Sequence, residues 1–256
     1  MTTGNKLQLP DVAIFTFCWG TEHVEKSLRS MLIAMDQVDF KRSVLITDGS
    51  KTDLSLFSKV IDKNNIEVCD MSVDLNSNLQ DDDANRIGFC ESFVQQTNKY
   101  ILDDFCLNVQ HDSTIIDIGK WSNEFLSYDY IGAVWPMEII QASDMVAGRI
   151  EEIPNVVGNG GFSLRTRKFV EESAKLSWQH KNEDLNICVF NYDKMTSAGI
   201  KFAPPHLAAQ FSKEHPTPHG VFARTLLFSY NSFGFHGEFN TGGMKFIERY
   251  DLKGQI

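Results

Sequence analysis

A carboxylate that directly follows an apolar run is the first feature of this sequence that could take part in chemistry. Gln110-His111-Asp112 comes after Phe105–Val109, whose composition predicts a buried strand. An Asp at a strand end, beside a diphosphate, is suited to bind a hard divalent cation such as Mg²⁺ or Mn²⁺. The alternative is an ordinary turn residue, and the local pattern does not decide between the two for Asp112.

Two adjacent carboxylates and a late histidine could complete a set of catalytic groups. Transfer of a group to a hydroxyl requires a base that takes the acceptor's proton, and Asp184 or its neighbour Glu183 could do this. The leaving group needs charge stabilisation, for which His236 could serve as a metal ligand. The alternative for Glu183-Asp184 is a helix N-terminus, where negative charge is favourable.

A glycine-rich segment, Val157–Arg165, reads VGNGGFSLR. Because glycine has no side chain, we predict that Gly160 and Gly161 let the backbone come close to a bound donor. The segment lacks the Gly-Lys-Ser/Thr of a Walker loop and the Gly-x-Gly-x-x-Gly of a dinucleotide-binding turn. A flexible turn is the alternative.

The elements that position these residues follow an alternating order. Short apolar runs predict strands and helical spacing predicts helices between them, in the order strand 12–17, helix 21–35, strand 43–47, helix 54–61, strand 66–73, helix 86–100, strand 105–109. Further strands are expected over 130–133 and 156–164, with a helix from Thr166. The alternation predicts parallel strands with right-handed crossovers.

The ends of the first two strands are expected to hold the nucleoside of a donor. In open α/β sheets, ligands lie at the carboxyl ends of strands near the point where the strand order reverses. We therefore predict that Thr16, Phe17 and Trp19 contact the donor, together with Asp48 after the second strand. The alternative for Asp48 is a cap or turn residue.

Composition limits the classes of function. A formal net charge of −10 argues against nucleic-acid binding, which depends on clustered Lys and Arg. The content of hydrophobic residues, 42%, is enough for a sizeable core. No internal repeat and no linker rich in Gly, Ser or Pro divides the chain. We therefore predict one domain, with a nucleotide-binding half over about 10–118 and an acceptor half over about 119–256.

The cysteines and the first residues bear on the compartment. The five cysteines are odd in number and show no Cys-x-x-Cys spacing, which favours reduced thiols. Met1–Pro10 is polar and does not resemble a signal peptide. No apolar run is long enough to span a bilayer. These features predict a cytoplasmic protein without an integral membrane segment.

Several segments together resemble an uncharacterised glycosyltransferase-like domain family of bacteria, viruses and microbial eukaryotes. They are DYIGA (129–133), VGNGGFSLR (157–165), Glu183-Asp184, KFAPP (201–205), GFHG (234–237) and the strand-end Gln110-x-Asp112. The resemblance covers nearly the whole chain. It implies the GT-A fold, a single α/β/α sandwich with a mainly parallel central sheet and the donor at the strand ends. Gln110 stands where the more familiar Asp-x-Asp motif has its first carboxylate.

The resemblance also implies roles for single residues. In GT-A enzymes the last Asp of the strand-end motif and a late His commonly hold Mn²⁺ on the diphosphate, which matches Asp112 and His236. In inverting members an acidic residue at a helix start is the base, which matches Asp184. We therefore expect an inverting transfer, assisted by Mn²⁺ or Mg²⁺, of a sugar from a nucleoside diphosphate, first of all a UDP-sugar, to a hydroxyl of a glycan or small acceptor. Trp135 is expected to stack on the acceptor, with core packing as the alternative.

Two other functions stay open at this stage. One is a catalytically inactive module of the same fold that binds a nucleotide sugar or a glycan. The pair Glu183-Asp184 argues against it, because binding alone has no use for a base. The other is a nucleotidyltransferase, for which a glycine-rich, basic loop is expected after the first strand. Residues 18–22, CWGTE, are neither.

Overall fold

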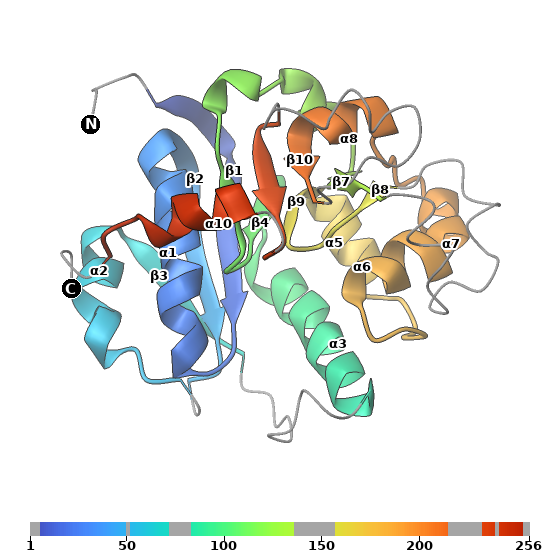
Figure 1. The fold of residues 1–256 in the computed structure, drawn as a ribbon. Helices are drawn as coiled ribbons and strands as arrows, with labels where there is room; N and C mark the ends of the chain where they lie inside the picture. The colour runs from blue at the N-terminus through green and yellow to red at the C-terminus, as the bar shows by residue number, and fades with distance from the viewer. Residues whose placement is uncertain are drawn as a thin grey trace.

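A six-stranded sheet lies at the centre of the computed structural model, which describes residues 6–49, 52–71, 83–135, 157–214, 232–238 and 241–252. Its strand order is β3 (Ile66–Asp70), β2 (Val38–Thr47), β1 (Leu7–Cys18), β4 (Phe105–Val109), β9 (Phe162–Thr166) and β6 (Tyr130–Ile131) (Figure 1). β3, β2, β1 and β4 run parallel, and only β9 runs against its neighbours β4 and β6. The predicted mainly parallel central sheet is confirmed.

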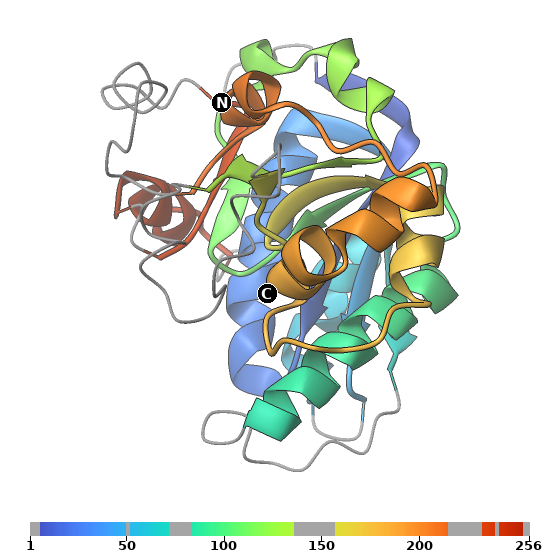
Figure 2. The ribbon, with the colours of Figure 1, turned by 90° about the vertical axis from the view of Figure 1, so that its right-hand side faces the viewer.

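Helices cover both faces of this sheet. They are α1 (Thr21–Gln37), α2 (Ser58–Lys63), α3 (Asp83–Tyr100), α5 (Arg167–Ser173), α6 (Glu183–Leu185), α7 (Tyr192–Ser197), α8 (Pro205–Phe211) and α10 (Thr241–Glu248). Short 3-10 helices span Ser55–Phe57, Ile118–Lys120 and Asn123–Ser127, and a π-helical stretch, η5, spans Asn186–Phe190. Figure 2 shows α1 and α10 on one side of the sheet and α3 and α5 on the other, which makes an α/β/α sandwich.

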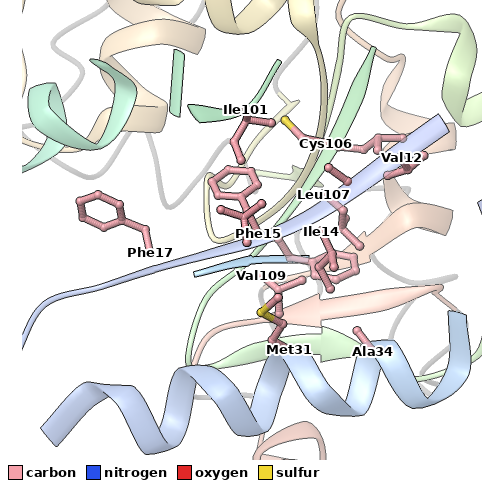
Figure 3. Packing of buried hydrophobic residues seen from close by; sticks show 14 of the residues in the cluster. Val12, Ile14, Phe15, Phe17, Met31, Ala34, Ile101, Cys106, Leu107 and Val109 are labelled. Atoms are coloured by element: carbon pink, nitrogen blue, oxygen red, sulfur yellow. The ribbon is translucent and has the colours of Figure 1, made fainter. Parts of the chain in front are cut away.

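Alternate residues of β1 face the two helical layers, as the two-residue period of a strand requires. Ile14 lies toward Met31 of α1, whereas Phe15 and Phe17 point to the opposite side (Figure 3). There the ring centroids of Phe15 and Phe17 lie 6.1 and 5.2 Å from that of Phe93 in α3. Burial on both faces explains why the second part of β1, Val12–Phe17, is almost entirely apolar without alternation.

A second, five-stranded sheet was not predicted. Its order is β5 (Ser113–Ile115), β11 (Gly234–His236), β10 (Ser212–Lys213), β7 (Ala133–Val134) and β8 (Val157–Gly158). None of these strands exceeds three residues. Such segments are too short to show a two-residue period in sequence.

Two predicted strands are each divided between the sheets. The strand expected over 130–133 is split at Gly132 into β6 and β7, and a side chain at Gly132 would overlap the carbonyl of Gly158. The strand expected over 156–164 is split into β8 and β9 by Asn159, whose φ of 74° interrupts the extended backbone. Val156 lies outside the described residues. The helix expected from Thr166 begins as predicted, with the Thr166 side chain as its N-cap.

The helices of this fold are short or carry polar residues. None of those within the described ranges is long and apolar enough to cross a bilayer.

Candidate active site

Three neighbouring strands end at one edge of the central sheet. Thr47 of β2 pairs with Cys18 of β1, and Asn108 of β4 pairs with Phe15 of β1. The residues that follow these strands, including Asp48, therefore lie at the same end of the sheet, beyond the carboxyl ends of the strands. The chain passes from β1 to β2 on one side and returns to β4 on the other, so this edge is the switch point where α/β proteins bind ligands.

The residues predicted to hold the nucleoside fall into two groups. Thr16 and Phe17 are buried, and the Phe17 ring packs edge-on against Phe89 at 5.1 Å. This packing favours a core role for the Phe17 side chain over contact with a ligand. A donor contact for Thr16 stays a prediction. Trp19 is half-buried and Asp48 is buried at the end of β2. A donor contact for these two residues stays a prediction.

Pairing of β4 with β9 brings two distant motifs together. Val109 pairs with Phe162, so the turn that begins at Gln110 lies beside the glycine-rich segment. The N–H of Gln110 donates to the carbonyl of Gly161 at 2.9 Å. The strand-end motif and the glycine-rich segment are therefore parts of one site.

The late histidine reaches the same place through β11. His236 pairs with Ser113 of β5, directly after the strand-end motif. Its Nε2 lies 3.4 Å from Oδ1 of Asp112, and the N–H of Gly237 donates to the Asp112 carbonyl at 3.0 Å. The predicted metal ligands Asp112 and His236 are therefore neighbours. Binding of one ion by both stays a prediction.

Glu214 is a member of the site that sequence reasoning missed. It follows β10, which runs parallel to β11 with Lys213 opposite Phe235. This register puts Oε1 of Glu214 3.4 Å from Nδ1 of His236. The only sequence signal is a carboxylate after a very short strand, and a strand of two residues is not recognisable by pattern.

The surrounding carboxylates determine the charge of His236. Burial by itself lowers the pKa of this imidazole, but the hydrogen bond to Glu214 and the charges of Asp112, Glu214 and Asp184 raise it to about 9. The three carboxylates therefore favour the protonated, cationic form of the His236 imidazole.

Asp184 lies in the first turn of α6, as the sequence predicted. Its Oδ2 accepts a hydrogen bond from the N–H of Gly160 at 3.3 Å, and its Oδ1 accepts one from the N–H of Leu185 at 2.8 Å. Burial nevertheless raises the pKa of Asp184, and the charge of Glu214 raises it further. The expected stabilisation of the ionised form by backbone N–H groups is present, but burial outweighs it.

Glu183 has a different environment from its neighbour. It is buried, and its Oε1 forms an ion pair with Nη1 of Arg165 at 2.7 Å. Burial raises the pKa of Glu183 and the Arg165 charge opposes this rise. Asp184 is only half-buried. The sequence left the two carboxylates interchangeable, and the geometry favours Asp184 as the group that meets an acceptor.

The two glycines of the glycine-rich segment lie against side chains of the protein. A side chain at Gly160 would overlap the carboxylate of Glu183, and one at Gly161 would overlap the ring of His236 and crowd Gln110. The close approach to this backbone is therefore made by side chains of the protein itself. Gly160 and Gly161 therefore make room for the site's own residues. Approach of a donor to this backbone stays a prediction.

Trp135 lies in the core beside the second sheet. It is 6% exposed, and its indole occupies the space that a side chain at Gly158 would need. This contact favours core packing, the alternative to stacking on an acceptor.

Two residues of the site suit a divalent cation. Oδ1 of Asp112 is buried and accepts no hydrogen bond from the described residues, and His236 Nε2 is its close neighbour. Within the described ranges, no three or more His, Cys, Asp or Glu side chains form a group that could hold a metal. Divalent cations in sites of this kind are often bound by one or two protein ligands plus substrate phosphates. Asp112 and His236 fit that arrangement.

The fold is similar to that of glycosyltransferases of known structure. The galactosyltransferase LgtC, in complex with donor and acceptor sugar analogues, has a TM-score of 0.57 at 12% identity, over 95% of this chain and 100% of that chain. Mouse xyloside xylosyltransferase 1, in its apo form, has a TM-score of 0.53 at 12% identity, over 92% of this chain and 99% of that chain. The likeness shows the fold, and the expected GT-A architecture is confirmed.

The family of the chain follows from its sequence. No curated protein matches it closely enough to count as a relative. Residues 76–236 match the family described as protein of unknown function, DUF5672. This range includes the strand-end motif, the Glu183-Asp184 pair and the late histidine. The chain belongs to the DUF5672 family of proteins of unknown function.

Proposed function

We propose that this protein is a glycosyltransferase that moves a sugar from a nucleoside diphosphate to a hydroxyl of a glycan or small acceptor. UDP is the nucleoside diphosphate that we expect first. The observation that carries the proposal is the convergence of Asp112, His236 and Asp184 at the switch-point edge of a GT-A fold. His236 lies 3.4 Å from Asp112, and Asp184 is joined to the same glycine-rich segment through Gly160. These groups come from the turn after β4, from β11 and from α6, so the tertiary fold is what assembles them.

Asp184 is the proposed general base. It takes the proton of the acceptor hydroxyl while the acceptor oxygen forms a bond to the anomeric carbon. The bond from that carbon to the diphosphate breaks, and its electron pair leaves with the diphosphate. Burial raises the pKa of Asp184, which makes this carboxylate a stronger base than an exposed Asp. A single displacement of this kind inverts the anomeric configuration.

Asp112 and His236 are the proposed protein ligands of Mn²⁺ or Mg²⁺. A cation bound there would neutralise charge on the leaving diphosphate. Glu214 orients the His236 ring from its other nitrogen. We expect UDP to bind more tightly with Mn²⁺, and Asp112→Ala to remove the gain. Equal affinity in EDTA would leave a transferase that does not use a cation.

The test begins with a panel of nucleotide sugars, with and without Mn²⁺, ranked by thermal shift, because a ligand of the native state raises its apparent stability. Release of UDP from the best donor is then measured with and without acceptors. Asp184→Asn should lower kcat by about 10²–10⁴-fold with donor affinity nearly unchanged. The matched control is Asp193→Asn, an exposed carboxylate in the first turn of α7.

The outcomes separate the candidate functions. Donor binding without any turnover or hydrolysis would identify a binding module of the same fold. Retention of the anomeric configuration, determined by NMR of the product, would reject Asp184 as the base in a single displacement. Near-native turnover in both Asp184→Asn and Glu183→Gln would show that the pair only begins a helix.

A further inference from the structure

Arg165 is a fully buried cation beside the candidate active site. It lies on β9, is 1% exposed, and forms the ion pair with Glu183. Three aromatic rings surround its guanidinium: those of Phe93, Tyr130 and Phe169, with centroids 5.3, 5.7 and 5.7 Å from Cζ. Burial opposes the charge, but the Glu183 carboxylate holds the pKa of Arg165 above its usual value. The guanidinium is therefore a permanent charge held in one orientation.

The same guanidinium also fixes the glycine-rich segment. Its Nη2 donates to the carbonyl of Gly160 at 3.2 Å, and its Nε donates to Oγ of Ser163 at 3.0 Å. Ser163 Oγ and Asn108 Nδ2 donate to that carbonyl as well. A carbonyl oxygen has two lone pairs, so three donors use its full capacity as an acceptor. The backbone at Gly160 has little freedom to move.

Two of the contacts of Arg165, those to Gly160 and Glu183, lead to Asp184. Gly160 is the residue whose N–H donates to Oδ2 of Asp184, and Glu183 is the preceding residue in α6. We infer that Arg165 is a positioning residue, which sets the place of the Asp184 carboxylate from two sides without touching the substrate. This inference rests on the role of base proposed for Asp184.

Arginine is required for this because of its shape. Three nitrogens of one planar group reach Glu183, Gly160 and Ser163 in different directions. A lysine carries its charge at a single nitrogen and cannot reproduce such a fork. Arg165→Lys therefore keeps the charge that balances Glu183 but loses part of the link to Gly160.

The first readout does not depend on activity. Hydrogen exchange of the Gly160 amide is followed by NMR in the wild type and in Arg165→Lys. The variant loses the hydrogen bond from Arg165 Nη2 to the Gly160 carbonyl, which loosens the backbone that carries the Gly160 N–H. Exchange of this N–H should therefore become about tenfold faster or more. The control is Arg42→Lys, whose guanidinium bonds Asp103, Glu67 and the carbonyl of Tyr100 away from the site. Unchanged exchange at Gly160 in Arg165→Lys would overturn the inference.

The second readout uses the active enzyme. Arg165→Lys should lower kcat by about 10²-fold, the cost of a misplaced catalytic group, with UDP affinity nearly unchanged and the acid limb of the pH–rate profile displaced. The double variant Arg165→Met/Glu183→Met removes the ion pair without leaving a buried charge. Its melting temperature should therefore lie closer to that of the wild type than the melting temperature of Arg165→Lys does. Its kcat should stay low.

The outcomes are separable from those of the proposed function. Recovery of both stability and kcat in the double variant, with a wild-type pH profile, would show that Arg165 only supports the fold. Near-native kcat in Asp184→Asn would reject the proposed base itself. Hydrogen exchange at Gly160 would still report whether Arg165 holds this segment.

Discussion

Nδ1 of His236 lies 3.4 Å from Oε1 of Glu214, and this contact joins the ends of two parallel strands, β10 and β11. The other ring nitrogen of His236 points to Asp112. A histidine that binds a metal usually donates its second N–H to a carboxylate, which fixes the ring and raises its basicity. Glu214 stands in that position relative to the proposed cation.

Glu214→Gln should therefore weaken binding of Mn²⁺ by about 10–100-fold, the usual effect of removing such a partner. The measurement is a calorimetric titration of the UDP-saturated protein with Mn²⁺. Glu238→Gln is the matched control. The Glu238 side chain is 67% exposed, and its Oε1 lies 3.8 Å from Nε2 of another histidine, His111. Equal loss of affinity in both variants would point to the net charge of the region rather than to the orientation of His236.

Gly161→Ala should abolish the Mn²⁺-dependent binding of UDP. The far-UV circular dichroism spectrum should stay unchanged. The added methyl would overlap the His236 ring, which must turn away from Asp112. Gly119→Ala is the control, because its methyl meets only the end of the Asp117 carboxylate. Retained binding in Gly161→Ala would mean that His236 is not held where the cation is proposed to bind.

The pH dependence of catalysis should report the raised pKa of Asp184. A base acts only when ionised, so kcat/KM should fall as the pH falls through this pKa. The midpoint of the acid limb should lie above the ordinary value for Asp, about 3.9. The measurement is kcat/KM as a function of pH for the wild type and Asp184→Asn. A limb of the same midpoint in the residual activity of Asp184→Asn would assign it to another group.

Phe162→Ala should lower the free energy of unfolding by about 3–5 kcal/mol, the usual cost of deleting a buried phenylalanine. Phe162 is fully buried on β9 and packs against Phe211 of α8 at 5.2 Å, and its ring fills the space beside Gly234 of β11. It thus joins the two sheets. Urea denaturation measures the effect. Leu56→Ala, at a side chain that is 65% exposed, should change stability by less than about 0.5 kcal/mol.

Local patterns in the sequence were enough to identify the central sheet and the main candidate residues. β4 has the predicted bounds, Phe105–Val109, and the alternation of strands and helices up to it is correct. The reason is that a strand buried on both faces is an unbroken apolar run, which is visible without tertiary information. Asp112 and Asp184 were predicted because carboxylates at strand and helix ends are local features, and His236 because an imidazole can bind a metal.

Contacts between distant segments could not be read in the same way. The second sheet consists of strands of two or three residues, which owe their existence to pairing with distant partners rather than to their own composition. Glu214 belongs to the site only because β10 lies beside β11, and Arg165 only because α6 brings Glu183 onto β9. Likewise, Asp184 and Glu183 are equivalent in sequence and differ by burial and by a single ion pair. The sequence by itself determined which residue types were available, and the packing of distant elements decided their neighbours and their charge.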